Sequence, residues 1–122
     1  MSEGIPRGRK VVSGYGDGGF RIAGERVDGS VILFPERFLA WDVSALSELT
    51  PDHFSDIIAC ANEVDILLLG CGDVPPIIGN ELRDALKAHN IVIDAMGTGA
   101  ACRTFNILLG ESRAVAAALI AV

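Results

Sequence analysis

The sequence predicts an α/β fold of three layers, in which N-terminal antiparallel strands lead into βαβ units around a central mixed β-sheet. Residues 11–43 carry short apolar runs broken by glycine-rich turns, which is the pattern of antiparallel strands. Beyond Asp42, helix-like segments alternate with short apolar ones, which is the pattern of buried parallel strands joined by crossover helices. The chain has 122 residues, of which 50% are hydrophobic, so it is long enough for one domain but too short for two domains with independent cores.

The first ten residues have the composition of a loose arm. Pro6 lies between Gly4 and Gly8, and the stretch carries basic charge. We therefore expect a flexible N-terminal arm over residues 1–10 and a single domain over residues 11–122.

Short strands are expected in the part of the domain that follows the arm. Trp41 alternates with Leu39 and Val43 at the two-residue period of a strand, so we expect its indole to lie in the core beneath the sheet. The strands are predicted at residues 20–22, 30–34 and 38–43.

The rest of the chain is expected to build the βαβ units. Thr50 followed by Pro51 is typical of a helix N-terminus, and apolar residues at helical spacing continue this helix to about Asn62. Two further helices are predicted at residues 81–89 and 99–109, and three strands at residues 65–69, 91–93 and 115–121.

Composition excludes several classes of partner and site. The formal net charge of −6 argues against nucleic acid as a partner. The longest apolar stretches, residues 64–71 and 114–122, are far shorter than the roughly 20 residues of a membrane-spanning helix. Residues 1–10 resemble no targeting signal, so we expect a cytoplasmic protein. Three widely spaced cysteines fit neither a disulfide framework nor a zinc site, so reduced thiols are expected.

A ligand crevice is expected at the carboxyl ends of the parallel strands, lined by residues 70–73 and by residues 94–103. Gly70 and Gly72 imitate the start of a dinucleotide fingerprint, with Asp94 at the distance of its acidic residue. The third glycine of the fingerprint is replaced by Pro75, which has no amide donor for a pyrophosphate. We therefore predict no nicotinamide or flavin cofactor, and neither a catalytic motif nor a metal site is identified.

The same crevice is expected to receive two thiols, Cys71 and Cys102. A position in the first turn of a helix, next to Arg103, lowers the pKa of a thiol and would favour a reactive thiolate at Cys102. No histidine is positioned as its base, and the commoner role of such a cysteine is that of a small buried side chain.

An anion pocket is a further candidate at this edge. It would be built from Thr98, Gly99, Arg103 and the free amides of the last helix, with Asp73 as counter-charge. The alternative is an ion pair of Arg103 with Asp73 or Asp94 that ties the loops together.

Several motifs occur in order along the chain: Gly19-Phe20-Arg21-Ile22 with Gly24, Gly29-Ser30-Val31-Ile32, Trp41, Thr50-Pro51, Leu69-Gly70-x-Gly72-Asp73, residues 98–106 and Ala117-Ala118-Leu119-Ile120. In that order they resemble the Mth-type domain of unknown function, a family that includes a mitochondrial assembly factor of respiratory complex I. The resemblance covers residue 10 to the C-terminus and implies a three-layer α/β fold with a mixed sheet. It carries over no enzymatic residue. Taken with the expected crevice, the candidate pocket consists of Gly70, Cys71, Gly72, Asp73, Asp94, Thr98, Gly99, Cys102, Arg103 and Asn106.

Two hypotheses of function follow. The first, which the resemblance implies, is a protein-binding module that assists the assembly of respiratory complex I or another membrane complex, with respiratory subunits as partners. The second is a small enzyme or ligand-binding protein that uses the crevice around Cys71, Asp73, Cys102 and Arg103. Self-association into a homo-oligomer through exposed strand edges is a third possibility.

Overall fold

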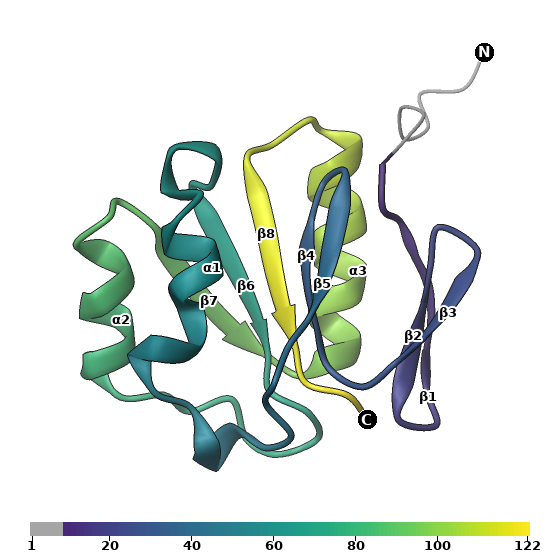
Figure 1. The fold of residues 1–122 in the computed structure, drawn as a ribbon, viewed down its shortest axis with the longest axis horizontal. Helices are drawn as coiled ribbons and strands as arrows, with labels where there is room; N and C mark the ends of the chain where they lie inside the picture. Colours follow the sequence, from purple (N-terminus) through teal and green to yellow (C-terminus); the bar gives the residue numbers. More distant parts are fainter. Residues whose placement is uncertain (1–8) are drawn as a thin grey trace.

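The structure is a computed structural model that describes residues 9–122 (Figure 1). The flexible arm predicted for residues 1–10 lies outside the described residues except for its last two. The amide of Lys10 donates to the carbonyl of Pro35 at 2.8 Å, and the Arg9 guanidinium lies 3.7 Å from the Glu36 carboxylate.

A five-stranded mixed sheet forms the centre of the molecule, as predicted. Its order is β5-β4-β8-β6-β7, so the strand that comes last in the sequence occupies the middle. β8 pairs antiparallel with β4 and parallel with β6, and β6 pairs parallel with β7. The strands are β4 (Val31–Phe34), β5 (Arg37–Ala40), β6 (Ile66–Gly70), β7 (Val92–Met96) and β8 (Val115–Leu119).

A second, three-stranded antiparallel sheet precedes the central one. It consists of β1 (Val12–Gly16), β2 (Gly19–Ile22) and β3 (Glu25–Asp28), in that order. Only β2 was expected from the sequence. β1 is interrupted by glycines and β3 is exposed and charged, so neither shows an apolar pattern, and the pairing with β2 forms them.

The helix predicted between Thr50 and Asn62 begins at the expected residue but is not one helix. Thr50 and His53 form a capping box, in which the Thr50 amide donates to Nδ1 of His53 at 3.0 Å. The segment then runs through η2 (Pro51–Phe54), α1 (Ser55–Ile58) and η3 (Ala61–Glu63), the first and last of which are 3₁₀ turns; a further 3₁₀ turn, η1 (Leu46–Glu48), precedes them. The last 3₁₀ turn closes with a hydrogen bond from the Val64 amide to the Ala61 carbonyl, and Val64 itself is buried in the core directly before β6.

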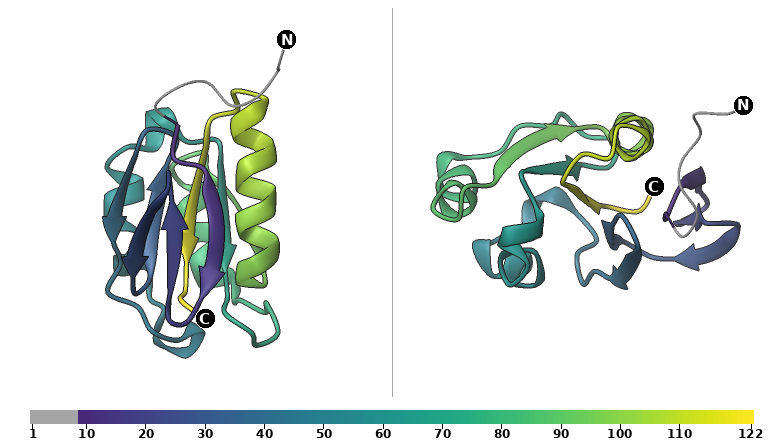
Figure 2. Two further views of the ribbon diagram at one scale, coloured as in Figure 1. Left: turned by 90° about the vertical axis from the view of Figure 1, so that its right-hand side faces the viewer. Right: turned by 90° about the horizontal axis from the view of Figure 1, so that it is seen from above.

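The other two helices match the prediction to within two residues: α2 (Asn80–Lys87) and α3 (Thr98–Gly110). α1 and α2 lie on one side of the central sheet, and α3 lies on the other, next to the three-stranded sheet (Figure 2). We call the two sides the α2 face and the α3 face.

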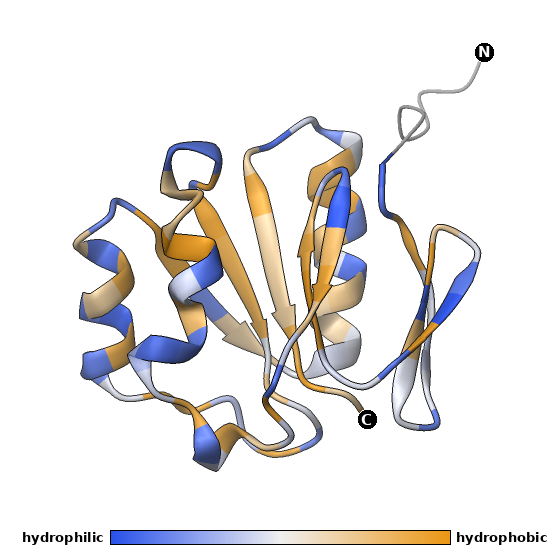
Figure 3. Cartoon of the chain, in the orientation of Figure 1, coloured by the Kyte–Doolittle hydropathy of each residue, from blue (hydrophilic) through white to orange (hydrophobic). Residues whose placement is uncertain are grey.

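Alternate residues of each central strand supply two cores. Leu67 and Leu69 of β6 pack on the α2 face, while Leu68 packs on the α3 face. Figure 3 shows β6 as largely hydrophobic, whereas hydrophilic residues interrupt α2. The main aromatic and leucine side chains of the α2-face core are Trp41, Phe34, Phe54 and Leu86, and those of the α3-face core are Phe20, Phe105, Leu33 and Leu109.

Trp41 lies in the core as predicted, with 7% of its surface exposed. Its ring is tilted against Phe54 with 5.8 Å between centroids, and Nε1 donates to the carbonyl of His53 at 2.9 Å. Val43 is buried with it, but Leu39 stays 36% exposed because β5 is an edge strand.

Candidate functional site

The carboxyl ends of β6 and β8 meet the N-terminus of α3 through Thr98. Its Oγ1 accepts a hydrogen bond from the Gly72 amide at 2.8 Å and donates to the Ile120 carbonyl at 2.7 Å. Thr98 is 1% exposed and Ile120 is 2% exposed, so the hydroxyl satisfies a buried carbonyl, and it also binds the amide of the half-buried Gly72. Thr98 therefore joins the loop after β6 to the end of β8.

Backbone contacts close the same edge further. The Cys71 amide donates to the Met96 carbonyl at 2.8 Å, and the Thr98 amide donates to the Gly72 carbonyl at 3.1 Å. The Ile120 amide donates to the Gly70 carbonyl at 2.9 Å. A Cβ at Gly70 would lie 2.9 Å from Cδ2 of Leu119 and 3.1 Å from the Thr98 Cα, so any other residue would have to shift the Leu119 side chain and α3 away from β6. The structure thus brings Gly70, Gly72 and Thr98 together. The side chains of Cys71 and Cys102, expected in one crevice, lie instead in the α2-face core and the α3-face core.

Of the two roles open to Cys102, the structure shows the small buried side chain and not the reactive thiolate with a lowered pKa. Cys102 is 2% exposed and faces the α3-face core, and burial raises the pKa of its thiol to about 12. Arg103 lowers the pKa by a smaller amount than burial raises it. Burial also raises the pKa of Cys71, against a smaller lowering by a hydrogen bond with the Met96 backbone. Both thiols are therefore protonated at neutral pH.

Alkylation will separate the three cysteines. Cys60 is only partly buried, and its Sγ accepts a hydrogen bond from the Arg37 guanidinium at 3.1 Å. Iodoacetamide at neutral pH should label Cys60 first, and Cys71 and Cys102 only when the protein unfolds, as read by mass spectrometry of tryptic peptides. Labelling of Cys102 in the folded protein as fast as that of Cys60 would contradict the burial described above.

Arg103 contacts a tyrosine instead of a carboxylate. Its NH1 donates to the Tyr15 hydroxyl at 3.4 Å, and within residues 9–122 it forms no ion pair. The predicted pairing with Asp73 or Asp94 is therefore not formed, and both carboxylates are exposed. The Tyr15 ring lies so close to Gly99 that a Cβ there would be 2.8 Å from its Cζ.

Asn106 lies apart from the crevice and binds the first strand. Its Nδ2 donates to the Val12 carbonyl at 2.7 Å, and its Oδ1 accepts from the Val12 amide at 2.9 Å. The side-chain amide thus pairs with β1 as a neighbouring strand would. Asn106 and Tyr15 together attach the three-stranded sheet to α3.

Replacing Asn106 with alanine should lower the free energy of unfolding by about 1–3 kcal/mol, because both polar groups of Val12 lose their partner. Urea unfolding measures the change, and amide exchange at Val12 should accelerate. The matched control is Asn62→Ala at an exposed position, which should shift stability by about 0.5 kcal/mol or less. Equal effects of the two substitutions would show that the contact with Val12 contributes nothing.

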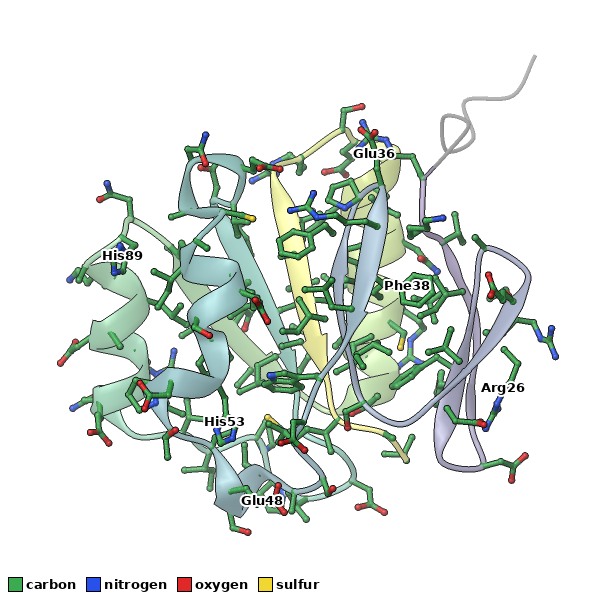
Figure 4. The ribbon with its side chains drawn as sticks, viewed as in Figure 1. Arg26, Glu36, Phe38, Glu48, His53 and His89 are labelled. Carbon is green, nitrogen blue, oxygen red and sulfur yellow. The ribbon has the colours of Figure 1, made fainter. Side chains whose placement is uncertain are left out.

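Two pockets lie away from the predicted residues. One, of about 340 Å³, is lined by Arg9, by Glu63 of η3 and by residues 35–37 and 112–114 of the β4–β5 and α3–β8 turns. Figure 4 shows Glu36 at this end of the molecule, and Glu48 and His53 at the other end. The second, of about 270 Å³, lies between α2 and β7 and is lined by Arg83, Lys87, Ile91, Val92 and Ile93. None of the ten predicted residues lines either pocket.

Exposed apolar side chains gather in the loop between β6 and α2. Val74 is 47% exposed and Ile77 is 79% exposed, on either side of Pro75 and Pro76. Neither side chain is among the predicted site residues, yet an apolar run around two prolines is a readable signal in the sequence, because turns that only reverse the chain are usually polar.

Residues 9–122 contain no group of three or more histidine, cysteine or acidic side chains placed to hold a metal ion. Among the helices of the same residues, none combines the length and apolar character needed to cross a membrane.

Comparison with known proteins gives named relatives. NADH dehydrogenase (ubiquinone) 1 alpha subcomplex assembly factor 3 of Drosophila melanogaster is 34% identical over 113 residues, and its Homo sapiens counterpart is 32% identical over 109. These matches cover 90% and 89% of this chain, but only 58% and 59% of the relatives' own length. An uncharacterised protein of Rhodobacter capsulatus is 34% identical over 113 residues, covering 93% of this chain and 86% of its own.

Solved structures share the fold. A crystal structure described as an outer membrane protein from Bartonella henselae has a TM-score of 0.87 at 40% identity, covering 97% of this chain and 98% of that one. The Rpa2829 protein of Rhodopseudomonas palustris has a TM-score of 0.83 at 40% identity, and the match covers 97% of this chain and 89% of that one. A Mth938-like domain from Bordetella pertussis has a TM-score of 0.85 at 24% identity, and the match covers 98% of this chain and 90% of that one. At this identity the likeness shows the fold alone.

A family model described as "Protein of unknown function (DUF498/DUF598)" matches residues 12–120. This range begins at the first strand of the three-stranded sheet and ends directly after β8, so it contains both sheets and all the helices of the described residues. The match confirms the resemblance seen in the sequence motifs. The chain belongs to the DUF498/DUF598 family and has the Mth938-like fold.

Proposed function

We propose that this chain is a protein-binding module that assists the assembly of a respiratory membrane complex of the NADH dehydrogenase type. The observation that carries the proposal is the pair of assembly factors from Drosophila melanogaster and Homo sapiens, which match 90% and 89% of this chain. The aligned region therefore includes nearly the whole fold. We place its action in the cytoplasm, with subunits of the respiratory complex as partners.

The β6–α2 loop is the surface that fits such a role best. Ile77 exposes 79% of its surface next to Val74 and two prolines, so burial against a partner would remove apolar area from water. Proline restricts the loop before binding, which lowers the entropy lost when it docks. Burial of both Cys71 and Cys102 gives no comparable support to a thiolate enzyme.

Deletion of the gene in its host tests the role. The amount of assembled NADH dehydrogenase, measured on blue native gels of membranes, should fall and be restored by the wild-type gene. An unchanged amount of assembled enzyme would refute the proposal for this organism.

The loop itself is tested by photo-cross-linking. A benzoylphenylalanine at position 77 should give an adduct that antibodies to NADH dehydrogenase subunits detect. The same group at exposed Glu111, which directly follows α3, should give none. Equal adducts at both positions would show that the loop is not the contact surface.

A further inference from the structure

The outer edge of β7 is an open strand edge of the central sheet. β7 ends the strand order, with β6 as its partner on one side. The Val92 amide donates to the backbone carbonyl of Asp65, and the Met96 carbonyl accepts from the Cys71 amide. Val92 and Met96 therefore turn their backbone groups toward β6. Because backbone groups alternate along a parallel strand, Ile93 and Ala95 turn their amides and carbonyls to the outer edge.

A groove of about 270 Å³ runs along this edge, between α2 and β7. Ile91, Val92 and Ile93 line it on the side of the strand, and Arg83 and Lys87 line it on the side of the helix. The Arg83 guanidinium donates to the Ile93 carbonyl at 3.2 Å, which shows that this carbonyl accepts a donor from outside the sheet. The groove therefore combines an open strand edge, apolar side chains and two cations.

We infer that the β7 edge binds an extended segment of a partner protein, with an acidic side chain, as an additional strand of the sheet. An amide of the segment takes the place of the Arg83 guanidinium at the Ile93 carbonyl. Arg83 and Lys87 then bind the carboxylate on the same face of the segment. Side chains of the opposite face cover Val92, which is 66% exposed.

The positive charges of the groove favour an acidic segment over a second copy of the chain as the occupant of the β7 edge. Two β7 edges that pair antiparallel about a two-fold axis would bring Arg83 and Lys87 of both copies together on one face, where they repel each other. Asp94 does not relieve this repulsion, because strand alternation places it with Val92, on the face opposite Ile93. On a chain of net charge −6, the two cations of the groove complement an acidic segment.

Titration with a short peptide tests the inference and does not depend on the assembly role, because it needs no component of the host. The probe is acetyl-Thr-Val-Glu-Val-Thr-amide, added to about 10 mM to the ¹⁵N-labelled chain and followed by amide chemical shifts. The shifts should be largest at Ile93 and Ala95. The matched peptide with lysine in place of glutamate should bind more weakly.

Two charge reversals complete the design. Arg83→Glu should weaken binding of the glutamate peptide by about two- to fivefold and should strengthen binding of the lysine peptide. Arg113→Glu makes the same change in net charge outside the groove, and it should leave both affinities as they are. Both arginines are exposed, so both variants are expected to fold.

Several outcomes would overturn the inference. They are unchanged Ile93 and Ala95 amides at the highest peptide concentration, equal affinity for the two peptides, or equal effects of the two reversals. A dimer of the free chain by light scattering, with slowed amide exchange at the same two residues, would assign the edge to a second copy and would also refute it.

Discussion

Thr98→Val is expected to lower the free energy of unfolding by about 2–5 kcal/mol, although the two side chains have nearly the same shape. The valine methyl can neither accept from the Gly72 amide nor donate to the Ile120 carbonyl, which Oγ1 of Thr98 does at 2.8 and 2.7 Å. The Ile120 carbonyl would stay buried without a partner, and the half-buried Gly72 amide would lose its partner as well. Urea unfolding followed by circular dichroism measures the change.

Thr98→Ser is the matched control. It keeps the hydroxyl and loses one methyl group, so its cost should be about 1 kcal/mol. A serine variant that is as unstable as the valine variant would assign the effect to packing instead of hydrogen bonding.

Alkaline pH should destabilise the protein through Cys102. Burial raises the pKa of this thiol from 9.0 to about 12, whereas the unfolded chain keeps the ordinary value. The stability from the protonated, buried thiol is therefore complete below pH 9.0 and is lost as the pH rises toward about 12. Over that interval the free energy of unfolding should fall by about 1.4 kcal/mol per pH unit on account of this group.

Cys102→Ala isolates the effect, because every other titrating group is shared. At neutral pH the variant should be less stable than the wild type, because it loses buried sulfur. Between pH 9 and 11 its free energy of unfolding should fall by about 2–3 kcal/mol less than that of the wild type. Unfolding by urea under reducing conditions at several pH values provides both slopes. Parallel curves would show that the thiol ionises equally in the folded and unfolded states.

Most of the central sheet and its helices could be predicted from the sequence, because burial on both faces leaves long apolar runs such as β6. The three-stranded sheet could not, because β3 has no buried residue and depends on its backbone bonds to β2. The place of β8 between β4 and β6 has no local signal either, since strand order arises from contacts between distant segments.

The candidate site shows the same division. The carboxyl ends of the strands do bring Gly70, Gly72 and Thr98 together, which the topology of parallel strands predicts. Position in the first helical turn did not decide between the two roles of Cys102, because successive helical residues differ by about 100° in direction, so Cys102 faces the core while Arg103 faces outward. The groove beside β7 depends on the spacing between α2 and the sheet, which no pattern in the sequence encodes.

The position of β8 also affects how the fold is made. During synthesis, β4, β5, β6 and β7 all leave the ribosome before β8, yet β4 and β6 are joined to each other only through it. Until β8 arrives, β4 with β5 and β6 with β7 can form only two separate half-sheets, each with an edge open to a wrong partner. Ribosome-bound chains that stop before Val115 should therefore be held by chaperones, and closure of the sheet should be a late step, completed by the insertion of a single strand.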